Sequence, residues 1–409
     1  MCFTAAAGQR VRSSRNRLFG ECHELNIREG TKMSHIQLKL LTQLEHIGEI
    51  MDSKASFEAA NPGVEIVLIQ SADNYESLQA FRSEEPDLMD SGGWSLFNQK
   101  GLFIDLLPFV RATPGLEEDL NPGIMRVATK DGTLPGLPDG VSIPLILYKK
   151  AMLDASGLPY PTDDWTWAEM IEMARKLTIR DKNGVATQFG FATGPDIELY
   201  EPFIMRNGGS YLSPDGSTAH GYIDSDATVE AFQLVIDMYR EFHACRKPEE
   251  PSKAGELHQG FALISAFTWF AGAVEVEGIG EEFDVVGLPQ MPGGVQANMV
   301  YMGATGITTK CEHPELAWAF LKHHVFERPE RFSRPWTLPI TRSVAEQCGM
   351  TSRRLWSRYI QEMDVVLPNG YYLNEKWNSS RQLINEDIVK MIVDGADVRQ
   401  TLKSWTRFA

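Results

Sequence analysis

The chain has 409 residues, of which 43% are hydrophobic and 23% charged, and its formal net charge is −16. This length accommodates two or three domain-sized units with large buried cores. The acidic balance argues against a general nucleic-acid-binding surface, which requires a clustered basic excess, so we expect no nucleic-acid partner. The five cysteines lie far apart and lack zinc-like or redox spacing, so they predict neither a disulfide framework nor a metal site.

Residues 1–32 are basic and show no hydrophobic periodicity. We expect them to be a disordered or mis-annotated N-terminal extension, the alternative being a basic arm for nucleic acid or a membrane. They contain no hydrophobic core of a signal peptide, and Cys2 follows Met1 directly, without the apolar segment that a lipobox requires. No run in the chain reaches the ~18 apolar residues of a membrane span. As written, the chain is expected to stay in the cytoplasm.

Strands and helices are predicted to alternate after this extension. A strand at 35–41 precedes a helix with apolar residues on one face over 47–51, and a second strand follows at 64–70. This second run is almost continuously apolar, which is typical of a sheet covered on both faces. Strand, helix and strand in this order predict a right-handed parallel unit. The same pattern returns at 86–90 and 101–110.

A second region is predicted after 137–150. The helix that follows begins with a capping box, in which Thr166 precedes Glu169 by three residues. Apolar residues at helical spacing predict three helices, at 166–177, 228–239 and 313–326. We therefore expect an α/β protein with two lobes.

The sequence lacks the common catalytic and nucleotide-binding motifs, including a Walker loop, GxGxxG after a strand, GxSxG and HExxH. We predict no enzyme, no catalytic residue, no cofactor and no metal. Tryptophans in expected loops are the more informative feature, because an indole offers a flat apolar face and one donor to a sugar ring. Core packing is the alternative for each. These tryptophans are Trp94, Trp269, Trp336 and Trp377.

The order of segments from Ile36 to the C-terminus resembles the family 1 extracellular solute-binding proteins, the sugar-capture subunits of bacterial ABC importers. The segments that carry the resemblance are FEAANPGVEIVL (57–68), EEPDLMDSGGWSLFNQKGLFIDLLPF (84–109), DGTLPGLPDGVSIPLILYKKAMLDASGL (131–158), TWAEMIEMARKLT (166–178), GATGITTKCEHPELAWAFLKHHV (303–325) and TLPITRSV (337–344). The chain departs from the family pattern at Pro135 and at Tyr148-Lys149-Lys150, and it lacks the export signal of a family that acts outside the cytoplasm.

This resemblance implies a two-lobed periplasmic-binding-protein-like fold (type II), with a cleft between the lobes and several hinge crossovers. Lobe 1 would comprise 34–142 and 300–332, and lobe 2 would comprise 143–299 and 333–409. The implied function is to bind a carbohydrate, expected to be an oligosaccharide, and to deliver it by hinge closure to the membrane permease of an ABC importer. We expect a monomer. The alternative is a cytoplasmic sugar-sensing protein or regulator domain with the same fold.

The resemblance also implies ligand-binding residues. Glu201, in ELYEPFIMRNGGSYL (198–212), matches a sugar-binding acid of the maltose-type members, and Trp269, in GFALISAFTWFAG (260–272), matches their ligand-stacking tryptophan. Other candidates follow strands whose carboxyl ends would meet at a cleft or lie beside a crossover. They are Gln43, Glu45, Asp90, Ser91, Trp94, Asp139, Ser142, Tyr301, Gly303 and Trp336.

Overall fold

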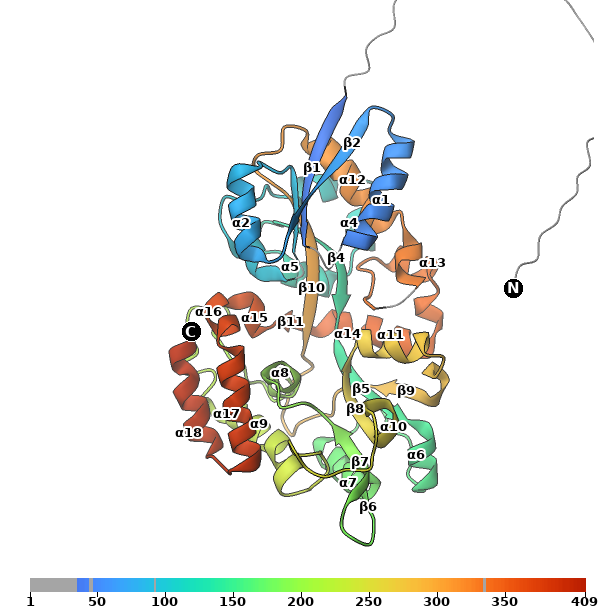
Figure 1. Cartoon of the computed structure of the whole chain (residues 1–409), viewed down its shortest axis with the longest axis vertical. Helices are drawn as coiled ribbons and strands as arrows, with labels where there is room; N and C mark the ends of the chain where they lie inside the picture. Colours follow the sequence, from blue (N-terminus) through green and yellow to red (C-terminus); the bar gives the residue numbers. More distant parts are fainter. Residues whose placement is uncertain (1–34, 44–46, 92, 334–335) are drawn as a thin grey trace, which may run out of the picture. The chain divides into compact units, whose positions relative to one another are not determined.

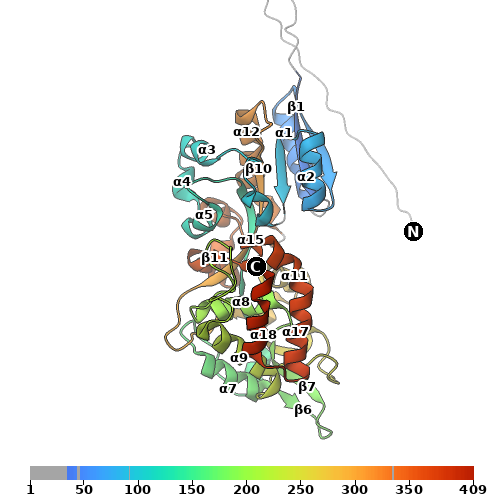
Figure 2. The same cartoon turned by 90° about the vertical axis from the view of Figure 1, so that its left-hand side faces the viewer.

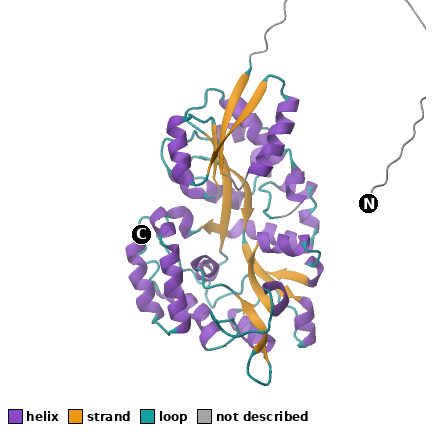
Figure 3. Ribbon diagram, in the orientation of Figure 1, coloured by secondary structure: helices purple, strands orange, loops and turns teal. Residues whose placement is uncertain are grey.

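The computed structural model describes residues 35–43, 47–91, 93–333 and 336–409. The predicted N-terminal extension and the candidate Glu45 lie outside these described residues. Ile36–Ala409 form one compact unit, which contains two β-sheets with helices packed around them (Figures 1 and 3). Among the described residues, no helix has both the length and the apolar character that a membrane span requires.

The first sheet has the strand order β11-β10-β3-β1-β2, with β4 paired to β10. β1 is parallel to β2 and to β3, whereas β10 is antiparallel to β3 and to β4. Helices α1 and α12 pack against each other beside this sheet (Figure 1). Its strands are β1 (Ile36–Gln43), β2 (Val64–Ser71), β3 (Leu88–Ser91), β4 (Leu137–Ser142), β10 (Asn298–Ile307) and β11 (Val366–Pro368).

The second sheet has the order β6-β7-β8-β5-β9, with β7 and β8 parallel and the other pairs antiparallel. β8 lies inside the sheet, and all seven of its residues are buried. The C-terminal helices α17 and α18 pack against α8 and α9 (Figure 2). The strands are β5 (Pro144–Lys149), β6 (Ile179–Arg180), β7 (Ala186–Ala192), β8 (Phe261–Phe267) and β9 (Phe283–Val286).

Helices supply most of the remaining structure. Those in the N-terminal half are α1 (Ile47–Ala60), α2 (Asn74–Ser83), α3 (Leu107–Ala112), α4 (Leu116–Asp119), α5 (Pro122–Ala128), α6 (Lys150–Ala155), α7 (Trp167–Leu177) and α8 (Ile197–Arg206). Those in the C-terminal half are α9 (Asp226–Arg240), α10 (Leu257–Gly260), α11 (Thr268–Val276), α12 (Pro314–Phe326), α13 (Arg342–Gln347), α14 (Arg354–Glu362), α15 (Gly370–Leu373), α16 (Glu375–Ser379), α17 (Arg381–Val393) and α18 (Val398–Ser404). Short 3₁₀ turns are η2 (Trp94–Asn98), η3 (Gly280–Glu282), η4 (Pro329–Ser333), η5 (Met350–Ser352), η6 (Met363–Val365) and η7 (Trp405–Phe408).

The predicted helices and the parallel unit are confirmed. Thr166 caps α7, where its hydroxyl and the Glu169 side chain form both hydrogen bonds of the capping box. One expectation is wrong: residues 101–110 form no strand, because the chain enters α3 there. Pro108 lies in the first turn of α3, and the Leu107 amide donates to Asp105. β2 contacts α1 and α2, but it is the edge strand of its sheet, and most of its residues are only half-buried.

The chain passes between the sheets at several points. Ile143, which is fully buried, separates β4 of the first sheet from β5 of the second. β10 returns the chain to the first sheet. β11, whose residues fall in the range predicted for lobe 2, pairs with β10 and so returns the chain once more. Leu338 also pairs with Val141 of β4, so the segment before α13 contacts the first sheet.

A side chain completes the contacts of β10. β10 pairs with β11 over 298–300 and with β3 over 304–307. Between these stretches, the hydroxyl of Tyr372 in α15 accepts the Met302 amide and donates to the Met302 carbonyl. Asn369, just before α15, donates to the Val300 carbonyl at 2.9 Å. The turn after β11 is therefore fixed against β10 through side chains.

A buried charge network connects the passages between the sheets. The Glu362 carboxylate at the end of α14 accepts from Arg206 of α8 and from Arg358, each at 2.8 Å. It also accepts from Asn298 at 3.0 Å, and Asn298 donates at 2.8 Å to the carbonyl of Pro144. Arg206 and Glu362 are almost completely buried. Removal of one partner from such a pair leaves an uncompensated charge in the interior.

We expect Glu362→Ala to lower the free energy of unfolding by about 3–5 kcal/mol, because Arg206 loses its buried counter-ion. Urea unfolding followed by circular dichroism measures this loss. Arg175→Ala is the control: it breaks the exposed pair with Glu172 and should cost less than ~1 kcal/mol. Equal losses for the two variants would contradict a dominant role for the buried network.

Candidate functional site

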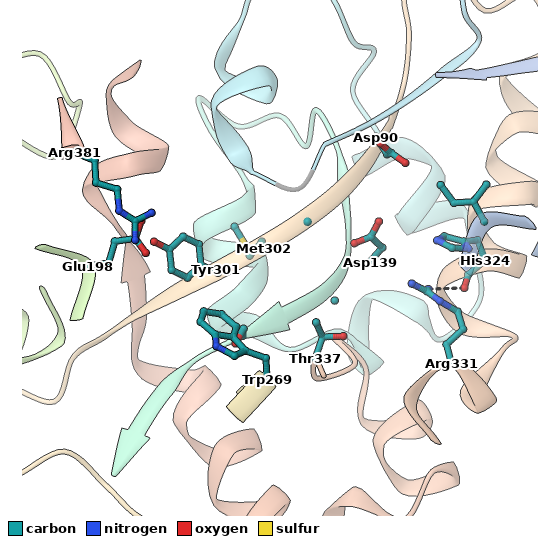
Figure 4. Close-up of a pocket in the computed structure, with 14 residues that line it drawn as sticks. Asp90, Asp139, Glu198, Trp269, Tyr301, Met302, His324, Arg331, Thr337 and Arg381 are labelled. Atoms are coloured by element: carbon teal, nitrogen blue, oxygen red, sulfur yellow. Dashed lines mark hydrogen bonds and ion pairs between the residues drawn. The ribbon is translucent and has the colours of Figure 1, made fainter. Parts of the chain in front are cut away.

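A pocket of about 500 Å³ is lined by residues from both sheets and from the helices that follow their strands (Figure 4). This volume lies within the range of about 300–1,000 Å³ that is typical of small-molecule sites. The structure brings six of the predicted site residues together here: Asp90, Asp139, Ser142, Trp269, Tyr301 and Gly303. Met302, between Tyr301 and Gly303 and considered with them as a candidate, also lines the pocket. The lining residues that the sequence did not indicate are Ile50, Gly140, Glu198, His324, Arg331, Thr337 and Arg381.

Trp269 forms the aromatic wall of the pocket. The buried strand β8 ends at Phe267, and α11 begins at the next residue, so Trp269 lies in the first turn of the helix. Its ring is stacked on that of Phe267, with centroids 4.2 Å apart and an interplanar angle of 11°. The side chain is nevertheless 44% exposed. One indole face is therefore supported by the protein, and the other is available to a ligand.

Hydrogen bonds hold this aromatic wall to two passages between the sheets. Ser142, the last residue of β4, lies 2.5 Å from the hydroxyl of Thr268. Thr268 is fully buried and donates to the carbonyl of Trp336 at 3.0 Å. Trp336 itself is 42% exposed but does not line the pocket. The backbone that carries Trp269 is thus tied both to β4 and to the segment before Leu338.

Two aspartates form the first-sheet side of the pocket. Asp90 at the end of β3 accepts the Thr42 hydroxyl at 2.5 Å and the Gln43 amide at 2.9 Å. Asp139 in β4 lies beside Gly303, where a Cβ would come within 2.9 Å of its carboxylate. At position 303, therefore, any residue other than glycine would force the Asp139 side chain to move. Both carboxylates can accept hydrogen bonds from ligand hydroxyls.

Three predicted first-sheet candidates position their neighbours rather than line the pocket. Gln43 donates through its amide to Asn74 at 2.9 Å, and Ser91 donates to the same residue at 3.1 Å. Ser91 is buried, as is Trp94, whose ring packs against Phe97 with centroids 5.0 Å apart. Trp94 therefore follows the core-packing alternative, as does the buried Trp377.

A compact charged cluster forms the second-sheet end of the pocket. Glu198 in the first turn of α8 forms an ion pair with Arg381 of α17 at 2.6 Å, and Asp196 pairs with the same guanidinium at 2.6 Å. Burial raises the pKa of Glu198, although Tyr301 and Arg381 act in the opposite direction. Burial disfavours the charge of Arg381, but Asp196 and Glu198 outweigh it and raise the pKa of the guanidinium. Figure 4 shows Glu198, Arg381 and Tyr301 at one end of the pocket, with His324 and Arg331 at the other.

Glu201 differs from its predicted position. It lies one turn after Glu198 in α8, but its side chain is only 2% exposed and does not line the pocket. Its Oε1 atom accepts the Gly370 amide at 2.8 Å. Burial raises the pKa of Glu201 from 4.5 to about 8, with the charge of Glu198 adding to the shift and the Gly370 amide opposing it. Glu201 therefore fixes α15 against α8.

Of the pocket residues that the sequence did not indicate, some have a local sequence signal and others have none. Glu198 could have been found, because Asp196 is a helix N-cap and places Glu198 in the first turn, three residues before Glu201. Arg381 carries no such local signal. It reaches the pocket only because α17 packs against α8. Among the described residues there is also no group of three or more histidine, cysteine or acidic side chains arranged to hold a metal.

We expect the raised pKa of Glu201 to make stability pH-dependent. The folded state favours its protonated form, so its stabilising contribution is complete below pH 4.5 and is lost as the pH rises through about 8. A tenfold change in an acid dissociation constant corresponds to about 1.4 kcal/mol. Glu201→Gln should remove this component while its amide oxygen still accepts the Gly370 amide.

Urea unfolding of both proteins from pH 5 to pH 9 measures the difference. The advantage of Glu201→Gln over the parent protein should grow with pH. Glu346→Gln, at an exposed position, is the matched control for the loss of one carboxylate. A difference in stability between Glu201→Gln and the parent protein that does not change with pH would contradict the shifted pKa.

The chain is similar to a family model, to curated relatives and to solved structures. A family model described as "Bacterial extracellular solute-binding protein" matches residues 45–323. The sn-glycerol-3-phosphate-binding periplasmic protein UgpB of Agrobacterium fabrum is 26% identical over 176 residues, which are 40% of this chain and 39% of the relative. UgpB of Rhizobium meliloti is 24% identical over 240 residues, which are 56% of this chain and 55% of the relative. The matches thus span about half or less of these curated relatives.

The structure of the sugar-binding protein MalE from Xanthomonas citri covers 91% of this chain and 95% of its own, with a TM-score of 0.76 and 16% sequence identity. At this identity the similarity shows the fold. The two-lobed arrangement of the two sheets is therefore confirmed.

Proposed function

Because the chain belongs to the bacterial extracellular solute-binding protein family, we propose that it binds a carbohydrate in the pocket between its two sheets and delivers it to an ABC importer. The family is a non-enzymatic, substrate-binding type, so the ligand would be captured without a bond being broken.

Trp269 is the observation that carries the proposal. A soluble protein buries most large aromatic side chains, and six of the nine tryptophans here are at most 3% exposed. Trp269 is 44% exposed inside a pocket, with its ring held flat against Phe267. A rigid indole with one available face stacks well on the C–H face of a sugar ring, and it loses little conformational entropy on binding.

The polar residues around Trp269 support the same ligand class. Asp90 and Asp139 offer carboxylate acceptors, and the ring of Tyr301 lies beside the indole, with ring centroids 6.2 Å apart. A polyhydroxylated ligand needs several acceptors around one apolar face, and this pocket combines both. The mixture favours a sugar over a purely apolar ligand.

The mechanism would be closure of one sheet unit on the other. Asp90 and Asp139 belong to the first sheet, whereas Trp269 follows β8 of the second. A ligand that contacts all three stabilises the arrangement in which both sets of contacts are made. We propose that the membrane permease of the importer recognises this ligand-bound form, and that the protein acts as a single chain.

Isothermal titration with neutral mono- and oligosaccharides tests the proposal, with tryptophan emission as a second signal. At least one sugar should bind, and Trp269→Ala should weaken its binding at least tenfold, or ~1.4 kcal/mol, because the stacking face is lost. Tyr75→Ala is the control, since Tyr75 is 70% exposed on α2 and outside the pocket. A broad panel that gives neither heat nor a spectral change would refute the proposal.

A further inference from the structure

Arg381 raises the question of whether this pocket accepts anions. Arginine is a common ligand of phosphate because its planar fork of donors matches phosphate oxygens. Arg381 lines the pocket, and its side chain is 42% exposed. The partial relatives from Agrobacterium fabrum and Rhizobium meliloti carry the name of a phosphate ester that they bind. The same pocket fold could therefore serve either a neutral or an anionic ligand.

In this chain the Arg381 guanidinium already forms ion pairs with two carboxylates of the protein itself. Its Nη1 atom lies 2.6 Å from Glu198, and its Nη2 atom lies 2.6 Å from Asp196. Glu198 is only 8% exposed and itself lines the pocket, at the same end as Arg381 and Tyr301 (Figure 4). A phosphate that approached Arg381 would have to displace a carboxylate or accept a position beside it.

The N-terminus of α8 is occupied in the same way. A helix N-terminus is the other common anion site of proteins, because its first amides lack intrahelical partners. Here the Ile197 amide donates to Asn385 at 3.0 Å, and the Glu198 amide donates to the Asp196 side chain at 3.1 Å. The Leu199 amide donates to the Asp196 carbonyl. The groups that would attract an anion at this end are thus satisfied within the protein.

We propose that Glu198 is a specificity-determining residue that excludes phosphorylated ligands by holding Arg381, so that the pocket selects uncharged polyhydroxylated ligands. This inference rests on the proposed carbohydrate-binding function and names the ligand class within it. Like charges brought close together disfavour the wrong partner, and this is one way in which a binding site rejects a close analogue. Glu198 and Asp196 provide that repulsion.

The test is titration of the full chain with sn-glycerol 3-phosphate and with inorganic phosphate, before and after substitution. We expect neither anion to give measurable heat with the parent protein. Glu198→Gln should bind sn-glycerol 3-phosphate at least tenfold more tightly than the parent, which is about 1.4 kcal/mol, because Arg381 loses one anion and the pocket loses one negative charge. Asp196→Asn, which keeps a good N-cap, should give a smaller gain.

Two further variants test whether Arg381 itself receives the anion. Adding Arg381→Gln to Glu198→Gln should abolish the gain, whereas a gain that persists would assign it to Arg331 and overturn the proposal. Glu346→Gln changes the net charge equally but lies outside the pocket, so it should bind no anion. Thermal unfolding shows that each variant is folded before it is titrated.

The outcomes distinguish this inference from the proposed function. The proposed role of Glu198 is refuted if the parent protein binds sn-glycerol 3-phosphate as tightly as Glu198→Gln does. It is also refuted if folded Glu198→Gln and Asp196→Asn gain no affinity for this ligand. Neutral sugars can still bind in that case. If no neutral sugar binds to the parent protein, the proposed function fails, whatever the anions do.

Discussion

The arrangement of the pocket depends on the buried carboxylate of Glu362. This one charge is shared by Arg206 at the end of α8, Arg358 of α14 and Asn298 at the start of β10. α8 carries Glu198 into the pocket, and β10 carries Tyr301 and Gly303, so two of the elements that line the site are held to one ion. Apolar packing alone would tolerate small shifts between these elements, whereas a buried ion requires its partners at fixed distances.

The pocket combines a rigid apolar face with charges that are largely satisfied inside the protein. Trp269 is supported by Phe267, and Arg381 is paired with Asp196 and Glu198. Around Trp269 the pocket offers a ligand one aromatic face and carboxylate acceptors, with His324 and Arg331 at its far end. This composition suits hydroxyl groups, because they donate to carboxylates without bringing a charge that must be desolvated.

Local sequence patterns predicted the α/β elements, and the family resemblance predicted the fold and one side of the site. Alternating periodicity predicted the parallel unit, the capping box predicted the start of α7, and the resemblance indicated Trp269 as a ligand-stacking residue. Glu201 illustrates the limit of such patterns. It and Glu198 lie one turn apart on the same helix and both are buried, but Glu198 lines the pocket whereas Glu201 contacts α15. Arg381 lies in a distant part of the sequence and meets Glu198 through helix packing alone. A single sequence contains no local signal for such a contact.

The Tyr372 hydroxyl on Met302 closes a gap in the hydrogen bonding of β10. β10 pairs with β11 over 298–300 and with β3 over 304–307, and Met302 lies between these stretches, completely buried. A backbone amide or carbonyl left without a partner there would cost about 1–3 kcal/mol. The phenol satisfies both groups without itself being a strand, so a single side chain joins the two short pairings into one continuous edge.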